Sequence, residues 1–136
     1  HRHPVFRDFP TSYYADWQWW DILNYATAVD LTDIRALTPV IQSVDSYEFN
    51  RKLGVSFEAC VGSGKLFVLA VDPVKDIEKR PAMQQLLMSV RNYVASDRFA
   101  PTVTLQPYEL DALFDYDKIR KAETRSSEAV KQLLNQ

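Results

Sequence analysis

The chain has 136 residues, of which 46% are hydrophobic and 25% charged, and its formal net charge at pH 7 is −2. This length suffices for one domain with a substantial core, and the composition is that of ordinary globular proteins. The lysines and arginines are scattered rather than gathered in a basic stripe, and no apolar run approaches the ~20 residues of a membrane-spanning helix. We therefore expect no nucleic-acid partner and no membrane span.

The first fourteen residues, HRHPVFRDFPTSYY, contain two prolines and several aromatic residues but show neither helical nor strand periodicity. Such a segment is typical of an ordered loop that is packed by its own rings. The chain starts without methionine and without a signal-peptide pattern, so we expect a fragment or a processed chain whose parent sequence continues upstream.

All three tryptophans lie in the stretch ADWQWWDIL, residues 15–23. The sequence predicts a short helix over residues 16–26 with Asp16 as its N-cap. One face of this helix would carry Trp17, Trp20 and Asn24, and another Trp19, Ile22, Leu23 and Ala26. Neighbouring residues on a helix point ~100° apart. At least one of the adjacent indoles of Trp19 and Trp20 is therefore expected to face outward or toward another domain.

Three segments rich in β-branched or aromatic residues follow, at 38–47, 53–61 and 65–72. The second alternates and predicts a half-buried strand, with Val55, Phe57, Ala59 and Val61 on one face and Ser56, Glu58 and Cys60 on the other. The third is almost continuously apolar, which predicts a strand covered on both faces. The intervening GSG (62–64) predicts a hairpin turn, so these two strands should be antiparallel neighbours.

Residues 80–96 show helical spacing of apolar side chains, and Pro81 suits the first helical turn. The stretch FAPTVTLQP (99–107) predicts an extended segment, and the charged amphipathic tail from residue 108 predicts one or two helices. In that tail the apolar residues are Leu110, Leu113, Phe114, Val130, Leu133 and Leu134. Three strands with flanking helices predict an α/β fold with a β-hairpin edge.

The candidate catalytic motifs lack residues that the corresponding reactions require. In GSGK (62–65), Ala59 and Leu66 replace the glycine and the hydroxyl residue of a phosphate-binding loop, and a strand follows instead of a helix. Cys60 is the single cysteine, so an internal disulfide is excluded. Nothing places His1 or His3 near this thiol as a base, and we interpret Cys60 as a small residue on a strand.

Near pairs of acids also occur, as in the paired carboxylates of glycosidases. They are Asp16 with Asp21, Asp45 with Glu48, and Asp72 with Asp76. Any chain of this length with 18 acids offers such pairs. We interpret Asp16 and Asp72 as residues at the ends of elements, and Asp45 is a further candidate for such a position. No metal-ligand spacing of histidine and cysteine exists. We therefore expect no catalytic residue, no metal site and no cofactor in this chain.

Three interpretations of the tryptophan cluster stay open: part of a core, an interface with another domain, or a platform for sugar. In the third, indoles stack on the apolar face of a sugar, and neighbouring polar side chains bond its hydroxyls. The residues concerned would be Trp17, Trp19 and Trp20 for stacking, and Asp16, Gln18 and Asp21 for the hydroxyls.

A resemblance to a known family rests on four stretches in a fixed order: HPVFRDFPT, DWQWWDIL, PVIQSVDSYEFNRKLGVSFEACVGSGKLFVLAVD and RPAMQQLLMSVRNYVASDRFAP. Together, over residues 3–101, they resemble a C-terminal region of large family 2 glycoside hydrolases, the β-galactosidase-type enzymes of gut Bacteroidetes. The resemblance implies a role in carbohydrate metabolism and a periplasmic or secreted location. In such enzymes the catalytic carboxylates lie in a separate barrel domain, which no segment here matches.

The layout is also similar to the last part of class I glutamine amidotransferase-like domains. This similarity implies a partial flavodoxin-like α/β layer, the later part of a larger domain. The amidotransferase nucleophile lies between glycines on a strand-to-helix turn, and Cys60 does not match it. The similarity therefore implies the fold and not the activity.

Taken together, these patterns predict an accessory α/β domain at residues 1–101, followed by an extended segment and a helical tail at 102–136. The function expected from the resemblance is that of a non-catalytic accessory domain of a family 2 glycoside hydrolase. Its partners would be other domains of the parent enzyme. The alternative is a carbohydrate-binding module for a galactoside or a plant oligosaccharide, with the Trp17–Trp20 cluster as its platform.

Overall fold

A computed structural model describes residues 3–12 and 14–114 of the chain. The elements, with 3-10 turns written η, are η1 (Pro4–Phe6), α1 (Trp17–Leu23), β1 (Val29–Asp30), β2 (Ile41–Ser43), β3 (Leu53–Val61), β4 (Gly64–Leu69), η2 (Ile77–Lys79), α2 (Pro81–Val94), β5 (Thr104–Leu105) and α3 (Pro107–Leu113). One compact unit is His1–Leu105, and a second begins at Gln106 and contains α3. Among the described helices, none has the length and apolar character needed to cross a membrane.

The first unit is built around β3, which pairs with the other four strands of a five-stranded sheet. Gly54 has partners in both β1 and β2, so these two strands lie on opposite edges of β3. Ser56 has partners in β2 and β4, and Cys60 has partners in β4 and β5. Strand β4 therefore follows the same edge as β1, and β5 follows the same edge as β2. The β3–β5 pairing is parallel and the other described pairings are antiparallel, so the fold is α/β with a mixed sheet.

Strands β3 and β4 form the hairpin that the GSG stretch predicts, with a register that runs from Ser56↔Leu69 to Val61↔Gly64. Gly62 has a φ of 57°, in the left-handed region that glycine enters without steric cost. The chain can therefore reverse within two residues. The predicted turn and the antiparallel arrangement of these two strands are confirmed.

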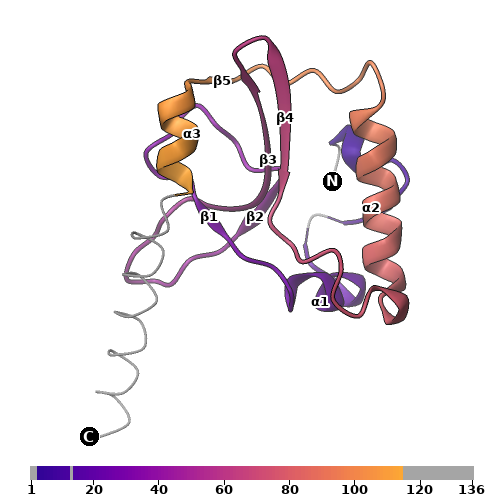
Figure 1. Ribbon diagram of the computed structural model, residues 1–136. Helices are drawn as coiled ribbons and strands as arrows, with labels where there is room; N and C mark the ends of the chain where they lie inside the picture. Colours follow the sequence, from indigo (N-terminus) through magenta and orange to yellow (C-terminus); the bar gives the residue numbers. More distant parts are fainter. Residues whose placement is uncertain (1–2, 13, 115–136) are drawn as a thin grey trace, which may run out of the picture. The chain divides into compact units, whose positions relative to one another are not determined.

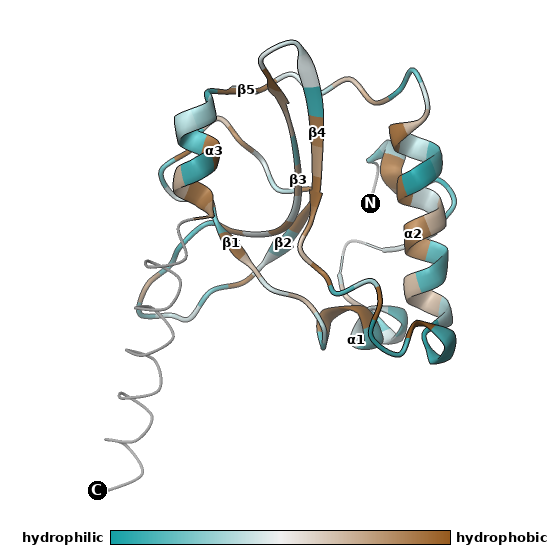
Figure 2. Ribbon diagram, viewed as in Figure 1, coloured by the Kyte–Doolittle hydropathy of each residue, from teal (hydrophilic) through white to brown (hydrophobic). Residues whose placement is uncertain are grey.

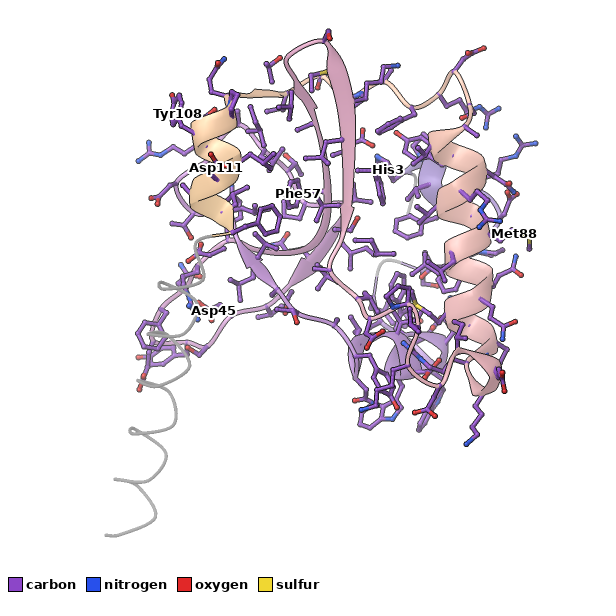
Figure 3. The ribbon with its side chains drawn as sticks, viewed as in Figure 1. His3, Asp45, Phe57, Met88, Tyr108 and Asp111 are labelled. Carbon is purple, nitrogen blue, oxygen red and sulfur yellow. The ribbon has the colours of Figure 1, made fainter. Side chains whose placement is uncertain are left out.

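Helix α2 covers one face of the sheet (Figure 1), and hydrophobic and hydrophilic segments alternate along it (Figure 2). The helix predicted at 80–96 is thus confirmed, with Pro81 in the first turn, where its missing N–H costs no hydrogen bond. Its buried residues are Met83, Leu86, Ser89 and Tyr93. Met88 lies on the outer side of the helix (Figure 3).

The N-terminal segment packs against α2 instead of projecting from the domain. Val5 and Phe9 are buried, and the N–H of Asp8 donates a hydrogen bond of 3.1 Å to the hydroxyl of Ser89, 81 positions later. That hydroxyl in turn donates to the carbonyl of Val5. The predicted ordered loop is confirmed by this packing. Tyr14 is exposed, and Tyr13 and His1 lie outside the described residues.

The expected burial of the two hairpin strands was wrong. Strand β4, expected to be covered on both faces, has no fully buried residue, whereas β3, expected to be half-buried, is buried over most of its length. The reason is position, because β3 has strands along both edges and β4 along one. The burial of β3 could not be predicted from the sequence, because the polar Ser56 suggested that one face of the strand meets solvent. Ser56 is fully buried, and its hydroxyl donates a hydrogen bond of 2.8 Å to the carbonyl of Val68.

The predicted alternation along β3 also fails at Val55. The β2–β3 register changes from Ile41↔Ser56 to Gln42↔Gly54, which leaves Val55 as an extra residue in β3. Val55 belongs to the core cluster that contains the buried residues of α2, whereas Phe57 lies outside that cluster and points away from α2 (Figure 3). A strict period of two would place both side chains on one face, and a β-bulge removes that equivalence.

The remaining predicted elements are present in shortened form. Of the strand expected at 38–47, residues 41–43 form β2, and the extended segment expected at 99–107 contributes β5. In the second unit, α3 begins after a capping box in which the N–H of Gln106 donates to a carboxylate oxygen of Glu109. Val130, Leu133 and Leu134 of the predicted tail helix lie outside the described residues.

Candidate functional site

The candidate site lies on α1, a helix of two turns. Asp16 is its N-cap as predicted, with extended backbone and a carboxylate oxygen that accepts a hydrogen bond of 3.3 Å from the N–H of Gln18. The helix ends where the N–H of Asn24 donates to the carbonyl of Trp20 at 3.2 Å. Between these ends, α1 places its three tryptophans in two different environments.

Trp19 is part of the core, with 5% of its surface exposed. Its indole packs edge-to-face against the rings of Phe6 and Phe9, at centroid distances of 5.9 and 5.2 Å. The indole N–H donates a hydrogen bond of 2.6 Å to the hydroxyl of Thr11. The core interpretation is thus correct for Trp19, whose polar atom is satisfied as buried indoles require.

Trp17 and Trp20 point outward, with 91% and 68% of their surfaces exposed. They are three residues apart and so lie on the same side of the helix, as the sequence predicts. Tyr14 and Leu23 are also exposed beside them. We call these four residues the aromatic face. The core interpretation was wrong for Trp17 and Trp20, because burial of the opposite side of α1 turns their side of the helix to solvent.

The aromatic face borders an open hollow of about 630 Å³. Its lining residues are Tyr14, Ala15, Asp16, Trp17, Trp20, Leu23 and Asn24. Two polar side chains, those of Asp16 and Asn24, therefore lie beside the two exposed indoles. Among the described residues, the lining carries one carboxylate and no cationic side chain, so the hollow is suited to apolar surfaces and to neutral hydrogen-bonding groups.

Three of the six predicted sugar-binding residues line this hollow: Asp16, Trp17 and Trp20. The other three are engaged elsewhere. Gln18 donates from its side-chain amide to the carbonyl of Pro10 at 2.8 Å, and Asp21 accepts from the guanidinium of Arg80 at 3.0 Å. Sequence reasoning placed Asn24 on the Trp17 side of the helix but gave it no role. It missed Tyr14, which lies before the helix and has no periodicity to mark it.

In each of the other two near pairs of acids, one carboxylate has local structural partners. Asp45 accepts hydrogen bonds from the Nε and Nη2 of Arg51, at 2.8 and 3.0 Å, and these bonds hold the pKa of its carboxyl well below the usual range. Asp72 accepts from the N–H groups of Val74 and Lys75, which lower the pKa of its carboxyl. The interpretation as a residue at the end of an element is confirmed for Asp16, the N-cap of α1, whereas Asp72 follows the isolated Ala26↔Val71 bridge, three residues after the end of β4.

Cys60 and the GSGK stretch also have structural roles. Cys60 lies on β3, and its thiol is 3.2 Å from the carbonyl oxygen of Pro101, which confirms it as a small strand residue. Lys65 donates to the carbonyl of Phe99 at 2.6 Å. Within residues 3–12 and 14–114, no three histidine, cysteine, aspartate or glutamate side chains are grouped closely enough to hold a metal ion.

A polar cluster that sequence reasoning missed lies between the sheet and α2. The hydroxyl of Tyr93 donates a hydrogen bond of 2.8 Å to Glu58, and His3 approaches the same carboxylate at 3.7 Å. His3 lies between β4 and α2 (Figure 3). Burial and the Glu58 carboxylate raise the pKa of the Tyr93 hydroxyl, and burial lowers the pKa of His3 against the opposing effect of Glu58. These three residues come from distant parts of the sequence, so no spacing marks them, and they join η1, β3 and α2.

Comparison with known proteins places the chain in a family. No curated protein matches it. Residues 1–115, which include α1 and the whole sheet, match the family described as "Domain of unknown function (DUF8487)". The match extends over most of the sequence, and the chain therefore belongs to the DUF8487 family.

Proposed function

We propose that the chain is a non-catalytic accessory domain of a family 2 glycoside hydrolase of the β-galactosidase type, and that it docks through its aromatic face. The observation that carries this proposal is the exposure of Trp17 and Trp20 on one side of α1. Large apolar groups gathered on a surface mark interaction sites, and tryptophan is enriched at the energetic centres of interfaces. The resemblance of residues 3–101 to a C-terminal region of these enzymes supports the other domains of the parent protein as the partner.

We extend the same proposal to the fold family of the sheet. We regard the mixed sheet as the later part of a flavodoxin-like or glutamine amidotransferase-like layer, supported by the parallel β3–β5 pairing. In this assignment the antiparallel hairpin contributes β4 to the edge of the layer, while β3 lies at its centre. A periplasmic or secreted location follows from the resemblance alone.

A second candidate function is favoured by the polar groups around the hollow. Asp16 and Asn24 line it beside the two exposed indoles, and the Asn24 side chain has no hydrogen-bond partner in the described part of the chain. Indoles stack on the apolar faces of sugars, while amides and carboxylates bond the hydroxyls. This arrangement supports a carbohydrate-binding module for a galactoside or a plant oligosaccharide.

The docking proposal is tested by the reactivity of the indoles toward N-bromosuccinimide. In the isolated chain, Trp17 and Trp20 should be oxidised rapidly and Trp19 slowly, as followed by peptide mass spectrometry. In the parent enzyme, Trp17 and Trp20 should be protected, while Trp19 serves as the internal control that is slow in both. Equal oxidation of Trp17 and Trp20 in the two proteins would contradict docking through this face.

The sugar-binding candidate is tested by tryptophan fluorescence during titration with galactose, lactose and plant oligosaccharides. A saturable change that is lost in both Trp17→Ala and Trp20→Ala would establish a carbohydrate-binding module. Met88→Ala is the matched control, because it removes an exposed apolar side chain from the outer side of α2. A flat titration of the wild-type chain would eliminate the module and leave the docking role.

The non-catalytic part of the proposal has its own test. The isolated chain, prepared free of host enzymes, should release no nitrophenol from a nitrophenyl galactoside above a buffer blank. Turnover that persists through repeated purification would overturn this part of the proposal.

A further inference from the structure

A buried arginine joins α1 to the segment that precedes α2. Arg80, the residue before α2, has 2% of its surface exposed. Its Nη1 donates to the carbonyls of Asp72 and Lys75 at 2.9 and 3.0 Å. Its guanidinium carbon lies 4.1 Å from the ring centroid of Tyr25, in a cation–π contact. The guanidinium is therefore held in one position by the segment that precedes α2 and by the ring that follows α1.

From this fixed position, Arg80 contacts α1 through Asp21. Its Nε donates to the Oδ1 of Asp21 at 3.0 Å, and its Nη2 lies 3.4 Å from the carbonyl oxygen of the same residue. That carbonyl belongs to the last turn of α1, where carbonyl groups have no partner within the helix. A cation at this end also interacts favourably with the helix dipole. Arg80 thus completes the C-terminal end of α1 through both side-chain and backbone contacts.

Arg80 is the charged partner of Asp21. The Oδ2 of Asp21 is buried and accepts no hydrogen bond from the described residues, so the guanidinium is what compensates the carboxylate. Because Asp21 is part of α1, its contact with Arg80 also affects how the helix orients the aromatic face. Asp21 lies four residues after Trp17, which makes these two residues neighbours on the helix surface, and it follows Trp20 directly in the chain.

A helix of two turns has little stability of its own, so its orientation depends on tertiary contacts. One side of α1 is fixed by the burial of Trp19 and Ile22. The rotation of the helix about that buried side is then limited by the Arg80–Asp21 contact. We propose that Arg80 is a positioning residue for the aromatic face, and that Asp21 serves this role instead of binding a ligand. This inference rests on the proposed function, because it concerns the surface through which the domain binds.

The test is the ¹⁹F NMR spectrum of the chain labelled with 5-fluorotryptophan, with no ligand or partner present. The three resonances are assigned with single Trp→Phe variants. Arg80→Lys keeps the charge but cannot reproduce the four hydrogen bonds of the guanidinium, and Asp21→Asn weakens the Arg80–Asp21 contact from the other side. Both variants should shift the Trp17 and Trp20 resonances and leave Trp19 in place. Arg51→Lys, which alters the comparable Asp45 pair in another loop, should shift none of the three.

The outcomes distinguish a positioning role of Arg80 from a general loss of packing in the domain. Unmoved Trp17 and Trp20 resonances in folded Asp21→Asn would overturn the proposal, even if Arg80→Lys does not fold. Equal shifts of all three resonances would also overturn it, because Trp19 reports on the core. If the expected shifts occur but the wild-type chain shows neither sugar binding nor protection in the parent enzyme, the proposed function fails and the positioning role stands.

Discussion

Trp19 and Trp20 are neighbours in the sequence, yet α1 leaves 5% of the first exposed and 68% of the second. The two indoles are separated by the ~100° rotation between successive helical residues. Trp19 is enclosed by Phe6, Phe9 and Thr11, while Trp20 lines the open hollow. The same short helix therefore contributes to the core with one ring and to a binding surface with the next.

Replacement of these two residues should separate stability from binding. We expect Trp19→Ala to lower the free energy of unfolding by ~3–5 kcal/mol, because it leaves a cavity in the core and removes the hydrogen bond from the indole to Thr11. Trp20→Ala should change it by no more than about 0.5 kcal/mol, as for an exposed position. Denaturant unfolding followed by circular dichroism measures both. A large loss of stability in Trp20→Ala would show that this ring is packed in solution.

Removal of the Arg80 side chain should also be costly. Arg80→Ala leaves the Asp21 carboxylate partly buried without its cation, and we expect a loss of roughly 3 kcal/mol in the free energy of unfolding, at the low end for a broken buried pair. The low end applies because 32% of the Asp21 side chain is exposed. Arg51→Ala is the matched control. The Arg51 side chain is 38% exposed in its pair with Asp45, so Arg51→Ala should lose less unfolding free energy than Arg80→Ala. Equal losses in the two variants, measured by urea unfolding, would contradict this ranking.

The Asp45–Arg51 pair gives a prediction for pH dependence. The pKa of Asp45 is lowered in the folded chain, so the stability that the pair contributes is present above the unfolded pKa of about 3.9. It is lost as the pH falls through the lower, folded pKa. The Asp45 carboxyl carbon should therefore remain in its ionised form at pH 3 in a ¹³C NMR titration. In Arg51→Gln the same carbon should titrate at a higher pH than in the wild-type chain, although the backbone N–H of residue 51 still holds the pKa of Asp45 below its ordinary value. An unchanged titration would refute the role of the Arg51 side chain.

The close packing at Gly54 predicts a specific sensitivity in the sheet. A Cβ at this position would lie 2.7 Å from the Cδ1 of Leu31, which is itself fully buried. We expect Gly54→Ala to cost ~1–3 kcal/mol through overpacking, as measured by thermal unfolding. At Gly64 the nearest atom is the carbonyl oxygen of Val61 at 3.5 Å, an ordinary contact. Gly64→Ala should therefore be close to neutral, and equal effects at the two positions would rule out crowding as the cause.

Local patterns predicted the elements whose causes are local. The N-cap at Asp16, the glycine turn at Gly62 and the proline that opens α2 each act within a few residues, and all three were found where the sequence places them. Part of the candidate site could be predicted for the same reason. Helical spacing alone put Trp17 and Trp20 on one side of α1, with Asn24 beside them.

Features that depend on distant neighbours could not be predicted. The central position of β3 depends on strands that come from residues 29 to 105, and neither its alternation nor the apolar run of β4 carries that information. The bulge at Val55 is set by the pairing with β2. Arg80 is 59 positions from Asp21, and no spacing marks two residues that far apart as partners.

The central position of β3 also constrains how the chain can fold as it leaves the ribosome. Three of its partner strands, β2, β4 and β1, are synthesised before or just after it, but β5 comes 43 positions after Val61, at Thr104–Leu105. The edge at Cys60–Val61 therefore stays unpaired until α2 has been made. We expect nascent chains that end before Thr104 to form the hairpin but to leave this edge open to association. Completion of the sheet is then one of the last steps of cotranslational folding, in keeping with the slow closure of long-range pairings.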